Sequence, residues 1–172
     1  MSQYKRCYIA GGHYFLTLVT FDRKPILTIP ENIERLKNAI QKVKQRHPFS
    51  INAMVILPDH LHCLWKLPEN DQDFSTRVRL IKRYFSMEIP MLINHRQEKQ
   101  VWQRRFWEHV IQNEDDWRNH MDYIHYNPVK HRYVQSVKEW QHSTFSYWVQ
   151  KKLSEEHWET SEPLSINMMN KE

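Results

Sequence analysis

Two histidines separated by one residue are the first side chains of this chain whose types and spacing suggest chemistry. His60 and His62 follow the apolar run 53–57 and lead into a second apolar stretch that ends at Leu67. Successive side chains of a β-strand point to opposite faces, so the two imidazoles would share one face and Cys63 would lie on the other. Such a pair provides half of a metal site. The chain holds 11 histidines, however, so the pair alone is equally compatible with two surface histidines in a hairpin.

A tyrosine and an asparagine form a second pair further along the chain. Acidic residues at 114–116 suit the positive end of a helix dipole, and the helix that follows would stop before Pro128. Tyr123 and Asn127 are four residues apart and therefore share one face of that helix, with His120 one turn earlier. Taken alone, a tyrosine in this setting is more often a half-buried packing residue than a catalytic one.

The elements that must position these side chains follow from hydrophobic periodicity and from helix and strand breakers. Gly11 and Gly12 are the only two glycines and precede an aromatic, β-branched run, which suggests unusual dihedral angles or a close approach by another group. The expected elements are a strand over 13–21, a helix from Pro30 that ends before Pro48, strands over 50–57 and 61–67, a helix from Phe74, a loop over 93–100, a strand near 101–111 and the helix of Tyr123. With no internal repeat or linker, we expect one domain over 1–150 and a polar C-terminal tail over 151–172.

Composition limits the classes of protein to which the chain can belong. Its 172 residues are enough for one domain with a sizeable core. The net charge of +5 suits a polyanionic partner, although a mildly basic solvated surface explains it almost as well. Two cysteines argue against a disulfide framework, and no apolar run resembles a transmembrane helix or a signal peptide. We therefore expect a soluble cytoplasmic protein.

Basic and aromatic residues occur together in several places. Aromatic side chains make up 13% of the chain, including 7 Trp, and bases stack on such rings when a protein binds single strands, although most such rings belong to cores. Arg77, Lys82 and Arg83 crowd the polar sides of the helix from Phe74, where a solvated face and a groove for a nucleic-acid backbone both account for them. The candidate phosphate contacts are Arg6, Lys82, Arg83, Arg104, Arg105, Lys130 and Arg132.

The order and setting of these motifs resemble those of the single-tyrosine HUH transposases, and more closely still their domesticated branch, the REP-associated tyrosine transposases. The resemblance runs from Tyr8 to Phe145 and is carried by 53–67 with its His-Leu-His, by 102–109, and by 122–131 with its Tyr-Ile-His-Tyr-Asn-Pro. It implies an α/β (α+β) fold: a ferredoxin-like domain of the HUH endonuclease type, with a central antiparallel sheet and helices packed on it. It also implies binding of bacterial repetitive extragenic palindromes as folded single strands, and metal-dependent cutting and joining of that DNA during transposition.

Carried over by position, the resemblance implies that His60 and His62 are metal ligands, that Tyr123 is the nucleophile, and that Asn127 is a third ligand from the helix. A divalent ion, Mg²⁺ or Mn²⁺, held by two imidazoles and an amide oxygen leaves positions open for phosphate oxygens. Attack by the tyrosine would give a 5′-phosphotyrosine intermediate that keeps the bond energy for rejoining strands. Tyrosine is a poor nucleophile at neutral pH, and His120 is a candidate base for it.

Two other functions stay open at the level of sequence. In the first, the chain is a non-catalytic sequence-specific DNA-binding protein derived from a transposase. In the second, it is a metal-dependent nuclease that uses His60 and His62 with water. A covalent Tyr123–DNA product would separate the transposase from both. Tyr126 lies about 300° round the helix from Tyr123, so the two cannot point into the same site. We expect a monomer rather than a homodimer, in the bacterial cytoplasm and at the nucleoid when bound to DNA.

Overall fold

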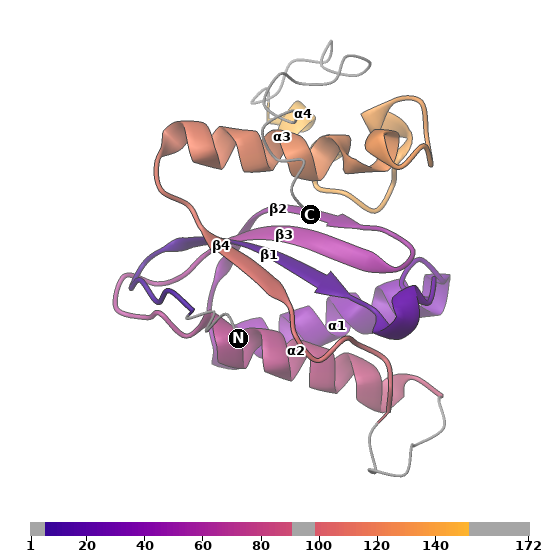
Figure 1. Cartoon of the computed structure of the whole chain (residues 1–172), viewed down its shortest axis with the longest axis horizontal. Coiled ribbons are helices and arrows are strands. Elements are labelled where there is room, and N and C mark those ends of the chain that lie inside the picture. Colours follow the sequence, from indigo (N-terminus) through magenta and orange to yellow (C-terminus); the bar gives the residue numbers. More distant parts are fainter. Residues whose placement is uncertain (1–5, 91–98, 152–172) are drawn as a thin grey trace, which may run out of the picture.

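The structure is a computed structural model that describes residues 6–90 and 99–151. Its centre is a four-stranded antiparallel sheet in the order β2-β3-β1-β4 (Figure 1). The strands are β1 His13–Val19, β2 Ser50–Ile56, β3 His60–Lys66 and β4 Trp107–Val110. The chain runs β1-α1-β2-β3-α2-β4, which is the ferredoxin-like order of elements. The expected α+β class with a central antiparallel sheet is therefore confirmed.

Helices cover both faces of the sheet. Figure 1 shows α1, Pro30–Arg46, and α2, Phe74–Glu88, side by side on one face, and α3, Glu114–Lys130, across the other. A short helix, α4 Phe145–Gln150, lies near α3, and two 3₁₀ turns cover Phe21–Arg23 and Val137–Glu139. Among the described residues no helix is long and apolar enough to cross a membrane. All but the first residue of the tail expected over 151–172, and all but the last two residues of the loop expected over 93–100, lie outside the described residues.

The first two helices begin and pack as their sequences predict. Pro30 occupies the first turn of α1, where its missing N–H is not needed. Ile33, Leu36, Ile40 and Val43 are all buried against the sheet, so the predicted apolar stripe is confirmed. Asp73 caps α2 by accepting a hydrogen bond from the backbone N–H of Thr76 at 2.9 Å.

Arg77 corrects one prediction for α2. We expected it among the basic side chains on the polar sides of the helix, but it is 1% exposed. Its guanidinium donates to both carboxylate oxygens of Asp71, at 2.6 and 3.2 Å, and to the backbone carbonyls of His47, Pro48 and Asp73. A buried guanidinium needs this full set of acceptors, so Arg77 joins α2 to the end of α1 and offers no surface to DNA.

The two glycines occupy the backbone that the sequence predicted to be unusual. Gly11 has a φ of +67°, in the left-handed region that a side chain disfavours. A Cβ on Gly12 would lie 2.9 Å from the carbonyl oxygen of Ile9. This tight turn leads the chain into β1, and the Tyr14 hydroxyl donates back to the same Ile9 carbonyl at 2.9 Å.

Alternation along β3 separates the packing face from the face that carries the histidines. Leu61, Cys63 and Trp65 belong to the apolar core beneath α1 and α2, whereas Leu64 packs in the second core beneath α3. His60 and His62 have the same parity as Leu64 and therefore face α3. The shared face predicted for the two histidines is confirmed.

Candidate active site

Both histidines of β3 are held through the same ring nitrogen. Nδ1 of His60 donates to Oδ1 of Asp59 at 2.6 Å, and Nδ1 of His62 lies 2.8 Å from Oγ1 of Thr17 on β1. The two ring centroids are 4.9 Å apart. A hydrogen bond at Nδ1 fixes the orientation of an imidazole and leaves Nε2 free to bind a ligand. The two imidazoles therefore present their Nε2 lone pairs on the same face of the sheet.

Helix α3 brings three side chains over the histidines. The Tyr123 ring lies 5.2 Å from the His62 ring, and His131, which caps the C-terminus of α3, lies 5.2 Å from His60. Asn127 is four residues from each of them and so lies between them on the same side of the helix. The structure thus gathers the four residues that the sequence singled out, and it adds His131.

Three buried polar atoms at this point have no partner in the part of the chain that the structure describes. Nε2 of His62 and both side-chain polar atoms of Asn127 are buried and have no hydrogen-bond partner among the described residues. An unsatisfied buried polar group costs about 1–3 kcal/mol, so each such group calls for an explanation. A divalent cation would accept electron pairs from an imidazole nitrogen and an amide oxygen, so these residues fit a metal ion.

The electrostatics of the site favour a neutral imidazole at His62. Burial, and after it the charge of His60, lowers the pKa of His62 well below its usual 6.5. Burial would raise the pKa of Asp59, but hydrogen bonds and charges from His60 and Arg23 outweigh it and hold that pKa below its usual value. Arg23 donates to the second oxygen of Asp59 at 3.0 Å. A neutral imidazole oriented by a carboxylate is the form that ligates metal.

The setting of Tyr123 is aromatic on one side and cationic on another. Its ring contacts Phe15 edge-on at 5.9 Å, and Nζ of Lys130 lies 4.7 Å from the ring centroid. Tyr123 is 2% exposed. Tyr123 and the neighbouring Tyr126 both belong to the apolar core beneath α3, so the different directions expected of the two tyrosines stay a prediction.

Comparison with known proteins identifies the family. The model of the family "Transposase IS200 like" matches residues 9–127, which include the histidine pair, Tyr123 and Asn127. Over 145 residues the chain is 48% identical to the REP-associated tyrosine transposase of Escherichia coli K12, with 84% of this chain and 83% of the relative covered. The chain belongs to the REP-associated tyrosine transposases.

Two further similarities extend along almost the whole transposase. A Haemophilus influenzae protein assigned to the same group is 41% identical over 174 residues, which cover 96% of this chain and 98% of the relative. The solved structure of a REP-associated tyrosine transposase bound to a REP hairpin matches with a TM-score of 0.79 and 46% identity, covering 90% of this chain and 89% of that one. Tyrosine transposases cut and join DNA, so this chain is a member of an enzyme family.

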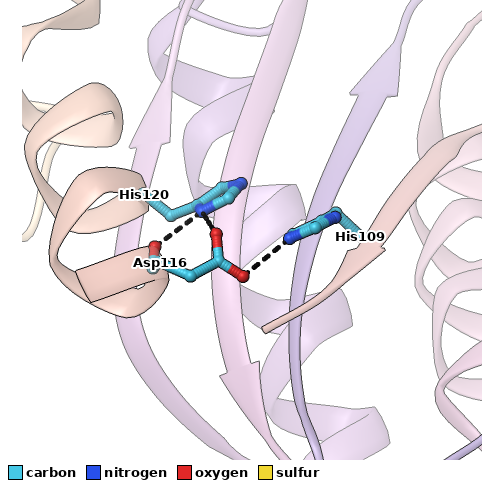
Figure 2. Close-up of side chains that lie close together, drawn as sticks. All are labelled: His109, Asp116 and His120. Carbon is cyan, nitrogen blue, oxygen red and sulfur yellow. Dashed lines mark hydrogen bonds and ion pairs between the residues drawn. The ribbon is translucent and has the colours of Figure 1, made fainter. Parts of the chain in front are cut away.

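A second cluster of polar side chains lies between β4 and the first turns of α3. Figure 2 shows His109 and His120 on either side of Asp116. Nε2 of His109 donates to one carboxylate oxygen of Asp116 at 2.8 Å, and Nδ1 of His120 donates to the other at 3.0 Å and to the Asp116 carbonyl at 2.8 Å. The ligand atoms of the three lie within 4.8 Å of one another, which is compatible with a metal site. Sequence reasoning singled out His120 as a base but missed Asp116 and His109.

The basic residues predicted to contact DNA fall into separate places in the transposase. Lys82, Arg83 and Arg104 line a hollow of about 620 Å³ between α2 and the segment before β4. Lys82 also donates to the Gln103 carbonyl at 2.5 Å, and burial lowers its pKa to about 8. Arg105 is exposed on the same segment.

The remaining basic candidates differ from one another. Lys130 and the exposed Arg132 lie at the end of α3 beside the histidine pair. Arg6 lies instead against the other face of the sheet, where it pairs with the buried Glu108 at 3.2 Å and its guanidinium covers the Phe106 ring at 4.1 Å. Arg6 therefore has an internal partner, and its contact with DNA stays a prediction.

Three residues that support the site were missed by sequence reasoning. Thr17 depends on the β1–β3 register, which pairs it with His62, and no local pattern carries that information. His131 depends on how α3 crosses the sheet. Asp59 did have a signal, because a carboxylate directly before a candidate metal-binding histidine is a natural orienting partner.

Proposed function

We propose that this transposase cuts and joins single-stranded DNA at palindromic, REP-like hairpins through a covalent 5′-phosphotyrosine intermediate. The observation that carries the proposal is that Tyr123 lies 5.2 Å from His62, whose buried Nε2 has no partner among the described residues. A nucleophile and a free ligand atom are thus adjacent on one face of the sheet. A solved relative is bound to a REP hairpin, which supports the same substrate class for this chain.

His60, His62 and Asn127 would hold the metal ion, Mg²⁺ or Mn²⁺. When bound, the ion polarises the scissile phosphate and stabilises charge on the departing 3′ oxygen. The protein supplies the other requirements. Asp59 and Thr17 orient the two imidazoles, and the apolar cores on the two sides of the sheet keep β3 fixed beneath α3.

Tyr123 is the proposed nucleophile. Its hydroxyl oxygen forms the new bond to phosphorus while the bond from phosphorus to the 3′ oxygen breaks, so the phenol loses a proton and the 3′ oxygen gains one. His120 is the candidate acceptor of the phenolic proton, since its ring contacts the same Phe15 side chain as Tyr123 does, at 4.6 Å. Attack by the 3′ hydroxyl of another strand on the phosphotyrosine then rejoins DNA without ATP.

The hairpin would lie against basic residues at the same end of the sheet. The segment that carries Arg104 is tied to β1 by a hydrogen bond from Gln103 N–H to the Val19 carbonyl at 2.9 Å, and Val19 pairs with His60. The hollow lined by Lys82, Arg83 and Arg104 therefore lies toward the same end of the sheet as the histidine pair, on the face that α2 covers. Lys130 and Arg132 lie at the end of α3, on the other face. Phosphate contacts by such residues position a strand without reading its sequence.

A single chain contains every residue of the proposed reaction. The histidines lie on β3 and Tyr123 lies on α3 of the same molecule, so we propose that a monomer is the active form. DNA as substrate agrees with action in the bacterial cytoplasm, at the nucleoid.

The proposal is tested by incubating the protein with a labelled hairpin that carries a single-stranded flank, in Mn²⁺ or Mg²⁺, followed by a denaturing gel. We expect a slow-migrating protein–DNA species that needs metal and disappears in Tyr123→Phe, while DNA binding is kept. Tyr126→Phe is the matched control, because it removes a hydroxyl three residues away and should cut normally. Cut DNA without the covalent species would indicate a nuclease that uses water. Tight binding without cutting would indicate a non-catalytic DNA-binding protein.

A further inference from the structure

Three aromatic rings form a parallel column beside the candidate active site. The Trp107 ring stacks on His109 with 9° between the planes and 6.0 Å between centroids, and His109 stacks on His120 with 12° and 4.8 Å. Trp107 and His109 come from β4 and His120 comes from α3. The column therefore crosses from the sheet to the helix above it.

Asp116 holds the inner two rings of this column in place. Its two carboxylate oxygens accept hydrogen bonds from His109 and from His120 (Figure 2), and one of them also accepts from the backbone N–H of Gln112 at 2.8 Å. A ring held by a hydrogen bond and by a stacked neighbour has little freedom to turn. The two fixed imidazole rings therefore hold the indole of Trp107 in a defined orientation.

The outermost ring of the column is open to solvent and close to the histidine pair. Trp107 is 44% exposed on β4, one of the two edge strands of the sheet. The register places Trp107 opposite Thr17, and Thr17 opposite His62, in one row across the sheet. Two strand spacings separate the ends of that row by about 10 Å. Phe15 links them further, since it contacts Trp107 edge-on at 5.5 Å and stacks on His62 at 5.4 Å.

We propose that Trp107 is the stacking platform for an unpaired base of the single-stranded segment next to the scissile phosphate. This inference rests on the proposed function and names how its substrate is held. A flat, exposed indole backed by two parallel rings is complementary to a nucleobase, which has a π-face whatever its sequence. Inside a duplex stem both faces of each base are already stacked, whereas an unpaired nucleotide can present a free face. The exposed Arg104 and Arg105, three and two residues before Trp107, are placed to contact the backbone of that nucleotide.

The test uses hairpin oligonucleotides with and without a single-stranded flank, and 2-aminopurine placed at successive positions of the flank. Stacking on Trp107 should quench 2-aminopurine fluorescence at one position in the wild type and not in Trp107→Ala. Alanine should weaken binding of the flanked hairpin by about 5- to 150-fold and leave binding of the flankless hairpin unchanged. Trp107→Phe keeps an aromatic face and should retain most of the affinity. Tyr147→Ala is the matched control, because Tyr147 is 58% exposed on α4 and should have no effect.

The outcomes separate this inference from the function on which it rests. Wild-type affinity for the flanked hairpin in Trp107→Ala, or an equal loss of affinity for both hairpins, would overturn the platform. If quenching depends on Trp107 but the protein forms no covalent product with DNA, the stacking platform is upheld and the proposed cutting mechanism is wrong. Absence of wild-type binding to either hairpin would overturn both. Equal thermal stability of the variants excludes misfolding as the cause of a loss.

Discussion

Replacing Thr17 by valine should weaken metal binding by the histidine pair while keeping the shape of the sheet. Thr17 is 7% exposed in the middle of β1, and its Oγ1 lies 2.8 Å from Nδ1 of His62. Valine has nearly the same shape and the same preference for strands. The substitution therefore removes the hydroxyl that orients His62 and leaves the Nδ1–H of a buried imidazole without an acceptor.

Two effects of different size follow from that lost contact. The stranded N–H should lower the free energy of unfolding by about 1–3 kcal/mol in the absence of metal. Loss of the group that orients a ligand typically reduces metal affinity by about 10- to 100-fold, which corresponds to about 1.4–2.8 kcal/mol. Calorimetric titration with Mn²⁺ measures the second effect, and urea unfolding in the presence of a chelator measures the first.

Thr144→Val is the matched control for Thr17→Val. Thr144 makes the same kind of contact, with its Oγ1 3.0 Å from Nε2 of the buried His125, and it also accepts a hydrogen bond from the Met54 backbone N–H at 2.9 Å. Thr144→Val should therefore lower stability at least as much as Thr17→Val and leave Mn²⁺ affinity unchanged. If Thr17→Val binds Mn²⁺ as tightly as the wild type, Thr17 does not orient a metal ligand. If Thr144→Val weakens Mn²⁺ binding equally, the effect reflects general loosening of the fold.

Two further substitutions test the groups that hold the fold together. Arg77→Met removes the charge that pairs with Asp71 and leaves the carbonyls of His47, Pro48 and Asp73 without their donor. Urea unfolding should therefore show a loss of about 3–5 kcal/mol, and a loss below about 1 kcal/mol would show that the pair behaves as a surface one. His125 is 3% exposed, and burial lowers its pKa to about 4. Between about pH 6.5 and pH 4 the unfolded chain therefore binds a proton at this residue that the folded chain does not. The free energy of unfolding should fall as the pH drops through this range, by up to about 3 kcal/mol. In His125→Gln this part of the pH dependence should vanish from a series of unfolding curves, and an unchanged slope would refute the assignment.

The fold was largely predictable because its elements carry strong periodic signals. The apolar stripe from Ile33 to Val43 and the alternation along 60–66 correspond to buried faces of α1 and β3. Alternation also placed the two histidines on one face, and the four-residue step placed Tyr123 and Asn127 together. Each of these inferences uses only the side-chain periodicity of a single helix or strand.

The parts that could not be predicted depend on how elements meet. Arg77 looked like one of several surface cations, and only the packing of α2 against the end of α1 surrounds it with the carbonyls of His47 and Pro48. The contact of His109 with Asp116 depends likewise on where β4 ends and α3 begins. Such contacts join residues through the fold, and the local sequence carries no pattern that reveals them.

The register of the sheet connects the apolar core on one face with the chemistry on the other. Leu16, Leu18 and Leu61 are buried under α1 and α2 and lock β1 against β3. A slip of one residue would exchange the two faces and place a leucine, instead of Thr17, opposite His62. The cost of exposing those leucines therefore protects the contact that orients the imidazole. The geometry of the candidate active site is thus fixed by apolar packing on the side of the sheet where no chemistry takes place.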